Sequence, residues 1–293
     1  MIDSAHAADG IGDHPVPLAS AAAHLGSVRP RPSPASPRVP REVLGRRLAR
    51  LAARTIRTRT LTAAPHPPMV SFSFDDVPVS AVTHGAPVLE AAGARGTFYV
   101  AGGLVAGDEP GRPIASAAQC RDLHRRGHEI GCHTYGHRPV SDLSPRALDA
   151  DLARNAAFLA ALDPDIRPTS FAYPFNTTSL RAKLRLQGLY ATCRGGVPGI
   201  NGRRIDPGFL RAVELADGLL DAEGARSWVA RTVAERGWLV FFSHGIGATP
   251  EPWGCHPALL AAAVAAAREF GAVIVPVREA VARLSGESAR AAA

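Results

Sequence analysis

The sequence predicts an α/β fold, a (β/α) barrel of seven or eight units, from two observations. Short apolar runs alternate with stretches of helical periodicity between residues 63 and 286. The runs are apolar throughout, which is typical of parallel strands that helices cover. Seven or eight such units in a region of this length favour a barrel over an open sheet.

The alternation locates each expected strand and helix. The expected strands are Met69–Phe74, Gly96–Val100, His128–Cys132, Thr169–Tyr173, Ala191–Arg194, Phe209–Val213, Leu239–Ser243 and Ala272–Val277. The expected helices are 81–92, 116–126, 144–161, 177–187, 224–236 and 256–270. In barrels of this kind the chemistry takes place at the C-terminal ends of the strands. Polar residues that directly follow a strand are therefore the first candidates for a site.

Both ends of the chain are expected to lie outside the barrel. Residues 1–40 are rich in Pro, Ala, Ser and Arg, and we expect them to be a disordered tail, like residues 287–293. Residues 41–62 predict a basic amphipathic helix, because leucines recur there at helical spacing between arginines. Residues 41–61 could rest on an anionic membrane surface. We favour the alternative in which this helix packs on the barrel and exposes its arginines.

Composition and charge exclude several classes of protein. The 293 residues are 46% hydrophobic and 20% charged, as in an ordinary globular protein. Of the net charge of +7, +6 lies in residues 1–60, so the barrel is nearly neutral and no nucleic-acid groove is indicated. No run reaches the roughly 18 apolar residues of a membrane span. Without a secretory signal or paired cysteines, a cytoplasmic protein is expected.

Two adjacent carboxylates, Asp75 and Asp76, follow the first expected strand. Adjacent acids at the end of a buried strand repel each other and lose solvation, so they need partners. They could cap the next helix, because acids are favoured at helix N-termini. Two acids side by side instead indicate two separate roles, one as a metal ligand and the other as a base.

A pair of histidines at a spacing of four, His133 and His137, follows the third expected strand. Two imidazoles and one carboxylate are a common ligand set for a hydrolytic metal, which leaves a position open for water. His124 and His128 have the same spacing but lie at the opposite end of that strand, so we expect them to be surface or turn residues.

Three motifs in order resemble those of the polysaccharide deacetylase family, the NodB-homology type of carbohydrate esterase family 4. Phe74-Asp75-Asp76 is similar to the first motif, and residues 133–137 are similar to the His-Ser/Thr-x-x-His motif. VFFSH, residues 240–244, is similar to the late motif, an apolar strand that ends in His. The resemblance covers roughly residues 68–280 and implies a distorted (β/α)7 barrel with an open substrate groove.

The resemblance also implies a role for each motif residue. Asp76, His133 and His137 would bind a divalent metal, with Zn²⁺ expected first and Co²⁺, Ni²⁺ or Mn²⁺ as alternatives. Asp75 would be the general base and His244 the general acid. The Phe175 N–H would stabilise the oxyanion, by the similarity of FAYPF to the family's third motif.

The prediction also covers the residues of the substrate groove and two motifs at which this chain departs from the family. We expect four residues to contact the substrate: Tyr173, Pro174, Phe175 and Phe242. The family has an Arg where this chain has Ala172, and only the fold can show whether Arg167 or Arg194 replaces it. The family's fourth motif, an acid and a Trp that support the catalytic His, is not recognisable, and Asp206 and Trp228 are only guesses for it.

The sequence therefore predicts a metal-dependent hydrolase that removes N-acetyl, or alternatively O-acetyl, groups from a carbohydrate. One alternative is a related amide hydrolase of a small or lipid-linked substrate, such as a deformylase or an allantoinase-like enzyme. Another is a carbohydrate-binding barrel that has lost catalysis. The sugar, its length and the oligomeric state are left open.

Overall fold

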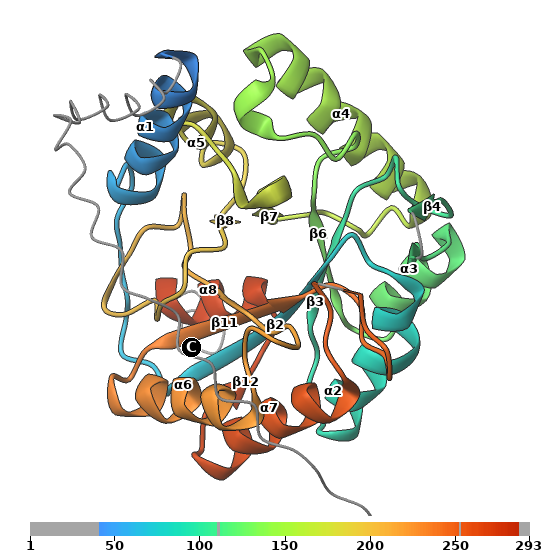
Figure 1. The fold of residues 1–293 in the computed structure, drawn as a ribbon, viewed down its shortest axis with the longest axis vertical. Coiled ribbons are helices and arrows are strands. Elements are labelled where there is room, and N and C mark those ends of the chain that lie inside the picture. Colours follow the sequence, from blue (N-terminus) through green and yellow to red (C-terminus); the bar gives the residue numbers. More distant parts are fainter. Residues whose placement is uncertain (1–40, 110–111, 252, 287–293) are drawn as a thin grey trace, which may run out of the picture. The chain divides into compact units, whose positions relative to one another are not determined.

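A computed structural model describes residues 41–109, 112–251 and 253–286. Seven parallel strands form one curved sheet in the order β10, β11, β2, β3, β6, β7, β8 (Figure 1). Their bounds are β2 (Met69–Asp75), β3 (Thr97–Val100), β6 (Glu129–Cys132), β7 (Ser170–Ala172), β8 (Thr192–Arg194), β10 (Val213–Glu214) and β11 (Trp238–Ser243). An isolated parallel bridge between Arg194 and Leu210 links β8 to the segment before β10, so the sheet curls towards its first strand. The predicted barrel class is confirmed. The expected tails, residues 1–40 and 287–293, lie outside the described residues.

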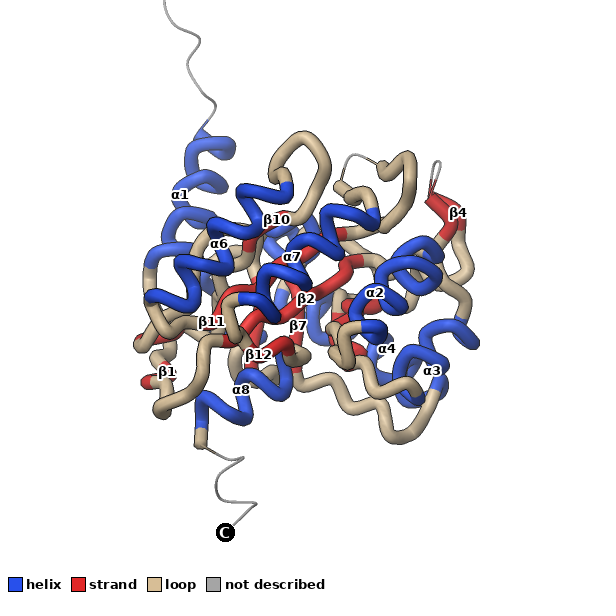
Figure 2. The backbone as a smooth tube through the Cα atoms, turned by 90° about the horizontal axis from the view of Figure 1, so that it is seen from below, coloured by secondary structure: helices blue, strands red, loops and turns tan. Residues whose placement is uncertain are grey.

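Helices cover the outer side of the sheet. Their bounds are η1 (Ala81–Gly85, a π-helix), α2 (Ala86–Ala91), α3 (Ala117–Arg125), α4 (Pro145–Leu162), α5 (Leu180–Leu186), α6 (Ala222–Ala234), α7 (Pro257–Glu269) and α8 (Val277–Ser285). Figure 2 shows α6 and α7 lying over β11 and β2. Ser116, Ser144, Ser179 and Asp221 each precede a helix and accept a hydrogen bond from an N–H of its first turn. These caps explain where four of the helices begin.

Strand β2 is the centre of the barrel, and each of its seven residues is buried. Phe72 stacks on Phe241 of β11 and Phe74 on Phe98 of β3, with ring centroids 5.6 and 4.8 Å apart. The buried Trp238 indole donates to Ser71 Oγ at 3.0 Å. A strand packed on both faces and paired on both edges is held rigidly, and it carries the two acids at its C-terminal end.

The last predicted strand, Ala272–Val277, is shorter than expected. Only β12 (Val273–Ile274) pairs with the start of β2, and α8 begins at Val277. Pro276 cannot donate to a ladder and is favoured at a helix start, which explains the early end of the strand. The Val277 N–H donates to Thr97 Oγ1 at 2.9 Å, and so the helix start is fixed to β3.

The N-terminal helix is also shorter than predicted. It is α1 (Arg41–Thr55), and Leu61–Thr62 forms β1, antiparallel to β9 (Arg204–Ile205). The ammonium of Lys183 on α5 donates to the carbonyls of Ala53 and Ile56 at 2.9 and 2.6 Å. A cation at free C-terminal carbonyls stabilises a helix end. The helix packs beside α5, but its Leu48 and Leu51 are both 57% exposed (Figure 1).

The remaining described elements are short. The hairpin β4 (Asp108–Glu109) and β5 (Arg112–Pro113) and the 3₁₀ turns η2 (Val140–Asp142) and η3 (Pro174–Asn176) lie in connections. All four cysteines are buried and unpaired. Within the described ranges, no helix combines the length and apolar character that crossing a bilayer needs.

The prediction that His128 is a surface or turn residue is wrong, because its side chain is fully buried. Its Nδ1 accepts from the Gly96 N–H at 3.0 Å, and its Nε2 lies 2.9 Å from Glu90 Oε1. Glu90 also accepts two hydrogen bonds from Arg126, both at 2.8 Å. The hydrogen bonds from Arg126 lower the pKa of Glu90 to about 2. This network joins α2 to the start of β6, away from the C-terminal ends of the strands.

The Glu90 network gives a testable pH dependence of stability. A carboxylate whose pKa is depressed on folding stabilises the protein above its unfolded pKa, near 4.5, and this stabilisation is lost as the pH falls towards about 2. Glu90→Gln keeps an acceptor for His128 but removes the charge. We expect it to lower the free energy of unfolding by on the order of 1 kcal/mol at pH 7, with the difference from the wild type shrinking below pH 4.5 and vanishing near pH 2.

Urea unfolding of both proteins at pH 7, 4.5 and 3 measures this difference. Glu235→Gln, in an exposed i,i+4 pair with Arg231, is the matched control and should change little. A difference that persists undiminished at pH 3 would contradict the assignment.

Candidate active site

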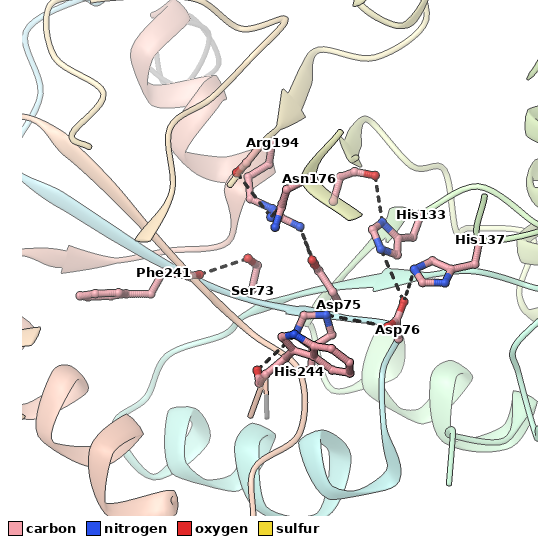
Figure 3. A network of polar contacts seen from close by, with 12 residues as sticks. Ser73, Asp75, Asp76, His133, His137, Asn176, Arg194, Phe241 and His244 are labelled. Atoms are coloured by element: carbon pink, nitrogen blue, oxygen red, sulfur yellow. Dashed lines mark hydrogen bonds and ion pairs between the residues drawn. The ribbon is translucent and has the colours of Figure 1, made fainter. Parts of the chain in front are cut away.

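The two carboxylates at the end of β2 face one cavity, as Figure 3 shows. Asp75 is the last residue of the strand, and Asp76 and Val77 follow with left-handed backbone angles, φ 61° and 59°. This conformation is unfavourable for a β-branched residue such as Val77. Thr134, His137, Phe175 and Asn176 are also left-handed. Strained backbone gathered in one place is typical of a functional site.

The Asp76 carboxylate, only 2% exposed, has two distinct surroundings. Its Oδ2 accepts from Arg112 Nη2 at 2.9 Å. Its Oδ1 lies 3.0 Å from His137 Nε2 and 3.5 Å from His133 Nε2, and within the described residues it receives no hydrogen bond of normal geometry. One ligand atom from each of Asp76, His133 and His137 lies within 4.8 Å of the others. Three side chains from two distant segments thus converge around a space for one cation.

The imidazole of His133 is oriented for a metal. Its Nδ1 is 2.9 Å from the Ala172 carbonyl, which can only accept, so Nδ1 carries the hydrogen and Nε2 presents its lone pair. Burial lowers the pKa of His133 to about 4, so the ring is neutral at pH 7. Burial by itself would raise the pKa of Asp76, but the close approach of His137 and the nearby imidazoles lower it well below its usual range.

The turn that follows β6 brings His137 back beside His133. Asp151 of α4 accepts hydrogen bonds from the Tyr135 and Gly136 N–H groups at 2.6 and 3.0 Å. The two imidazole rings lie 5.1 Å apart. The spacing of four is therefore realised in a tight turn rather than in a helix, and an acid on a separate helix holds that turn closed.

The other carboxylate, Asp75, is paired with Arg194. Arg194 Nη2 donates to Asp75 Oδ1 at 2.6 Å and also to Oδ2, while Nη1 donates to Asn176 Oδ1 at 3.0 Å. Arg194 is fully buried. It lies on β8 directly opposite Ala172 of β7, so the two side chains point to the same side of the sheet. The guanidinium missing at Ala172 is thus supplied by the neighbouring strand.

His244 follows β11 on the opposite side of Asp76 from the two histidines. Its Nδ1 lies 3.2 Å from the Trp253 carbonyl, and its Nε2 lies 3.8 Å from Asp76 Oδ2 (Figure 3). Glu214, at the end of β10, lines the same cavity. Burial raises the pKa of Glu214, and the charge of His244 opposes that shift. Glu214 and Trp253 thus provide an acid and a Trp beside His244.

These residues surround a cavity of about 750 Å³. Its lining is Asp75, Asp76, Arg112, His133, His137, Phe175, Asn176, Glu214, His244, Glu251 and Trp253. Phe175 and Trp253 are 59% and 54% exposed, and the Phe175 ring lies 4.7 Å from that of His137. Two exposed aromatic rings beside buried charged groups are suited to a ligand with both apolar and polar faces.

Three of the four predicted substrate contacts do not line the cavity. Tyr173 is buried and its hydroxyl donates to the Gly208 carbonyl at 2.8 Å, Pro174 is buried, and Phe242 packs in the core against Arg194. Tyr173 and Phe242, aromatic residues near strand ends with bulky neighbours, therefore pack in the core. Only Phe175 lines the cavity, because the left-handed turn at η3 points its ring outward.

The guesses for the fourth motif are also wrong. Asp206 pairs with Lys183 at 2.6 Å, Trp228 packs against Arg231, and neither lines the cavity. Arg167 is exposed and lies near the start of β7. Sequence reasoning missed Glu214, although it directly follows the expected strand Phe209–Val213. The strand-end rule that found Asp75 would have found it too.

The buried ion pair between Arg194 and Asp75 predicts that removing the arginine lowers stability strongly. Arg194→Met leaves the Asp75 carboxylate, 3% exposed, without its cation. Loss of one partner of a buried pair costs about 3–5 kcal/mol. We expect a loss of that size in guanidinium unfolding at pH 7, most of it recovered in Asp75→Asn/Arg194→Met. Arg167→Met, an exposed arginine, is the control.

Because Ala172 and Arg194 face the same way, Ala172→Arg/Arg194→Ala should recover part of the loss. An Arg194→Met protein within about 1 kcal/mol of the wild type would show that the pair is not needed for stability.

Comparisons with known proteins agree with this geometry. Residues 62–190 match the family model described as Polysaccharide deacetylase. No curated protein matches the chain.

Solved structures share the fold. A family 4 acetyl xylan esterase from Clostridium thermocellum, in complex with a cobalt ion, has a TM-score of 0.53 at 22% identity, over 74% of this chain and 92% of that one. The catalytic domain of peptidoglycan N-acetylglucosamine deacetylase from Eubacterium rectale has a TM-score of 0.50 at 14% identity, over 74% and 91%. A mutant of a CE4 family pseudoenzyme with restored enzymatic activity has a TM-score of 0.52 at 13% identity, over 75% and 70%.

At these identities the structural likeness establishes the fold, and the family match covers the segment that carries Asp75, Asp76, His133 and His137. The resemblance to the polysaccharide deacetylase family is therefore confirmed over residues 62–190, and the chain has the fold of the CE4 structures.

Proposed function

We propose that this protein is a metal-dependent hydrolase that removes N-acetyl groups from a saccharide. The observation that carries the proposal is the convergence of Asp76, His133 and His137 within 4.8 Å, with Asp75 and His244 beside them. A ligand set of two imidazoles and one carboxylate leaves room for water and substrate.

The residues present fit a divalent cation. Asp76 Oδ1 is a buried oxygen without a normal hydrogen bond, and His133 is held in the tautomer that frees Nε2. Zn²⁺ is the first candidate for this donor set, with Co²⁺, Ni²⁺ and Mn²⁺ as alternatives. When bound, such a cation supplies Lewis-acid chemistry, lowering the pKa of water and polarising a carbonyl.

Asp75 is the general base in this proposal. Arg194 takes both carboxylate oxygens through one nitrogen, which fixes the carboxylate at the cavity wall. Asp75 accepts a proton from the water that attacks the acyl carbon. The pairing with Arg194 holds the carboxylate at one place, so little reorganisation accompanies proton transfer.

Residues after two further strands act on the oxyanion and on the leaving group in this proposal. The hydrogen bonds of η3 are made by the Asn176 and Thr177 N–H groups, so the Phe175 N–H stands outside them and is our candidate oxyanion donor. His244 donates a proton to the departing amine nitrogen. Its Nδ1 is occupied by the Trp253 carbonyl, so Nε2 is the atom that delivers the proton.

Two features favour a saccharide amide as the substrate. Phe175 and Trp253 offer exposed rings on which the apolar faces of sugar rings can stack. Glu214 and Glu251 line the cavity and favour the cationic amine that amide hydrolysis releases. Release of a neutral alcohol from an O-acetyl ester would gain nothing from them.

The metal site can be tested by separating binding from turnover. Asp76→Ala should lose bound zinc and acetate release together, because it removes a ligand. Asp75→Asn should keep zinc but lose acetate release by on the order of 10²–10⁴-fold, because it removes only the base. Zinc is measured by elemental analysis, and acetate is measured with an N-acetylated chito-oligosaccharide.

His124→Ala, in the histidine pair of the same spacing away from the site, is the control and should change neither quantity. Full zinc content in Asp76→Ala, or a wild type that binds zinc but releases no acyl group from any saccharide, would overturn the proposal.

Glu214 should aid turnover through its negative charge in the catalytic cavity. Burial raises the pKa of Glu214, so the wild type should lose this charge, and with it part of kcat, at a higher pH than an ordinary glutamate would allow. Glu214→Gln should show a kcat about tenfold lower at pH 7 with zinc content unchanged, and should lack this acidic decline. A pH–rate profile of both proteins measures this. Identical profiles would remove Glu214 from the mechanism.

A further inference from the structure

A second cavity, of about 530 Å³, lies beside the end of α1. Its wall comes from three segments: the end of α1 and the residues just after it, with Arg54 and Arg57; residues 197–206, which include β9; and the residues before β10. Five arginines line it, Arg54, Arg57, Arg203, Arg204 and Arg211, and none of them serves the active site described above. We call it the arginine cavity.

The positive charge of the arginine cavity is not compensated. Among the described residues, Asp206 is the one acid in its lining, and this carboxylate already accepts from the buried ammonium of Lys183 at 2.6 Å. In the part of the chain that the structure describes, none of the five arginines has an ion pair. Five like charges around one cavity repel each other, and a bound anion would relieve that repulsion.

The backbone that carries these arginines is firmly held. Asn201 is buried, its Oδ1 accepts from the Arg211 N–H at 3.0 Å, and its Nδ2 donates to the Arg211 carbonyl at 2.9 Å. The β1–β9 pair fixes Arg204 opposite Thr62. Lys183 ties the end of α1 to α5. The arginines therefore stand on a preorganised frame, which lowers the entropic cost of binding a ligand.

The arginine cavity borders the catalytic cavity. Arg54 Nη2 donates to the carbonyl of Asn176 at 3.4 Å, and Asn176 lines the catalytic cavity, where its Oδ1 accepts from Arg194. Asn176 thus accepts a hydrogen bond from Arg54 of the arginine cavity and another from Arg194 beside the catalytic cavity. A ligand that extends past Asn176 would reach both cavities.

The two cavities differ in charge. Glu214 and Glu251 in the catalytic cavity disfavour an anionic group there, whereas the arginine cavity attracts one. Guanidinium groups bind phosphate oxygens in a bidentate manner and outperform other cations at this task. A substrate with a neutral acylated end and a phosphorylated end would therefore bind in one orientation.

We propose that the arginine cavity binds a phosphate or pyrophosphate group carried by the saccharide whose acyl group is hydrolysed next to it. This inference rests on the proposed function for the identity of the rest of the ligand. The phosphate could belong to a soluble sugar phosphate or to a lipid-linked saccharide. The exposed Leu48 and Leu51 on α1, and the exposed Ile56 just after it, would suit the lipid.

The first test is binding of inorganic pyrophosphate by calorimetry. Arg57→Gln/Arg204→Gln removes two arginines that have no side-chain hydrogen bond or ion pair in the described structure, so folding should be preserved. We expect binding at least tenfold weaker than in the wild type, because each lost charge-assisted bond is worth about tenfold. Arg268→Gln, an exposed arginine on α7, is the matched control and should bind like the wild type. Equal binding by all three proteins would overturn the proposal.

The second test compares an N-acetylated chito-oligosaccharide with its 1-phosphate as substrates. The wild type should show a KM at least tenfold lower for the phosphate, and the double variant should lose this preference while its kcat on the neutral sugar is unchanged. The same KM for both sugars in the wild type would overturn the proposal. Pyrophosphate binding that depends on Arg57 and Arg204, without turnover of either sugar, would overturn the proposed function but support the anion site.

A third measurement distinguishes the sources of phosphate. Sedimentation with phosphatidylglycerol vesicles, compared with phosphatidylcholine vesicles, reports binding to lipid headgroups. Vesicle binding that depends on Arg57 and Arg204, without any preference for the phosphorylated sugar, would assign the cavity to headgroups and overturn the substrate assignment. Preference for the sugar phosphate without vesicle binding would support a soluble substrate.

Discussion

The active site depends on one constraint: two adjacent carboxylates lie buried at the end of the central strand and must each receive a separate set of cations. Asp75 receives Arg194, whereas Asp76 receives Arg112 and faces the imidazoles of His133 and His137. Two buried anions this close would be prohibitively costly if they shared one environment. The left-handed backbone at Asp76 separates them, and β5, β6 and β8 supply the partners.

This constraint explains why the site is built from so many elements. His133 and His137 follow β6, Arg194 ends β8, and Arg112 comes from the separate β4–β5 hairpin. Three of these partners are held by a second contact. The Ala172 carbonyl orients His133, Asp151 closes the turn that carries His137, and Asn176 accepts from Arg194. The geometry of the proposed reaction is thus fixed by groups that are neither the proposed metal ligands nor the proposed base, which is the usual source of precision in metal sites.

The position of Arg194 shows how a guanidinium can stay beside a carboxylate while a motif changes. In a parallel sheet, register partners on neighbouring strands point to the same side, so a guanidinium on β8 reaches the space that a side chain at Ala172 of β7 would fill. Glu214 and Trp253 likewise come from separate segments, β10 and the loop after β11, and line the same cavity as His244. A motif read along one strand does not reveal such substitutions.

The sequence by itself determined the barrel class, most strand positions and the candidate residues at strand ends, because hydrophobic periodicity and the position of a residue after a strand are local properties. Tertiary structure alone decided that Arg194 rather than Arg167 pairs with Asp75, that Tyr173 and Phe242 are core residues, and that His128 is buried. It also decided where α1 ends and brought Arg54 next to Asn176. These outcomes depend on which segments lie side by side, and contacts between residues more than a hundred positions apart leave no periodic signal in the chain.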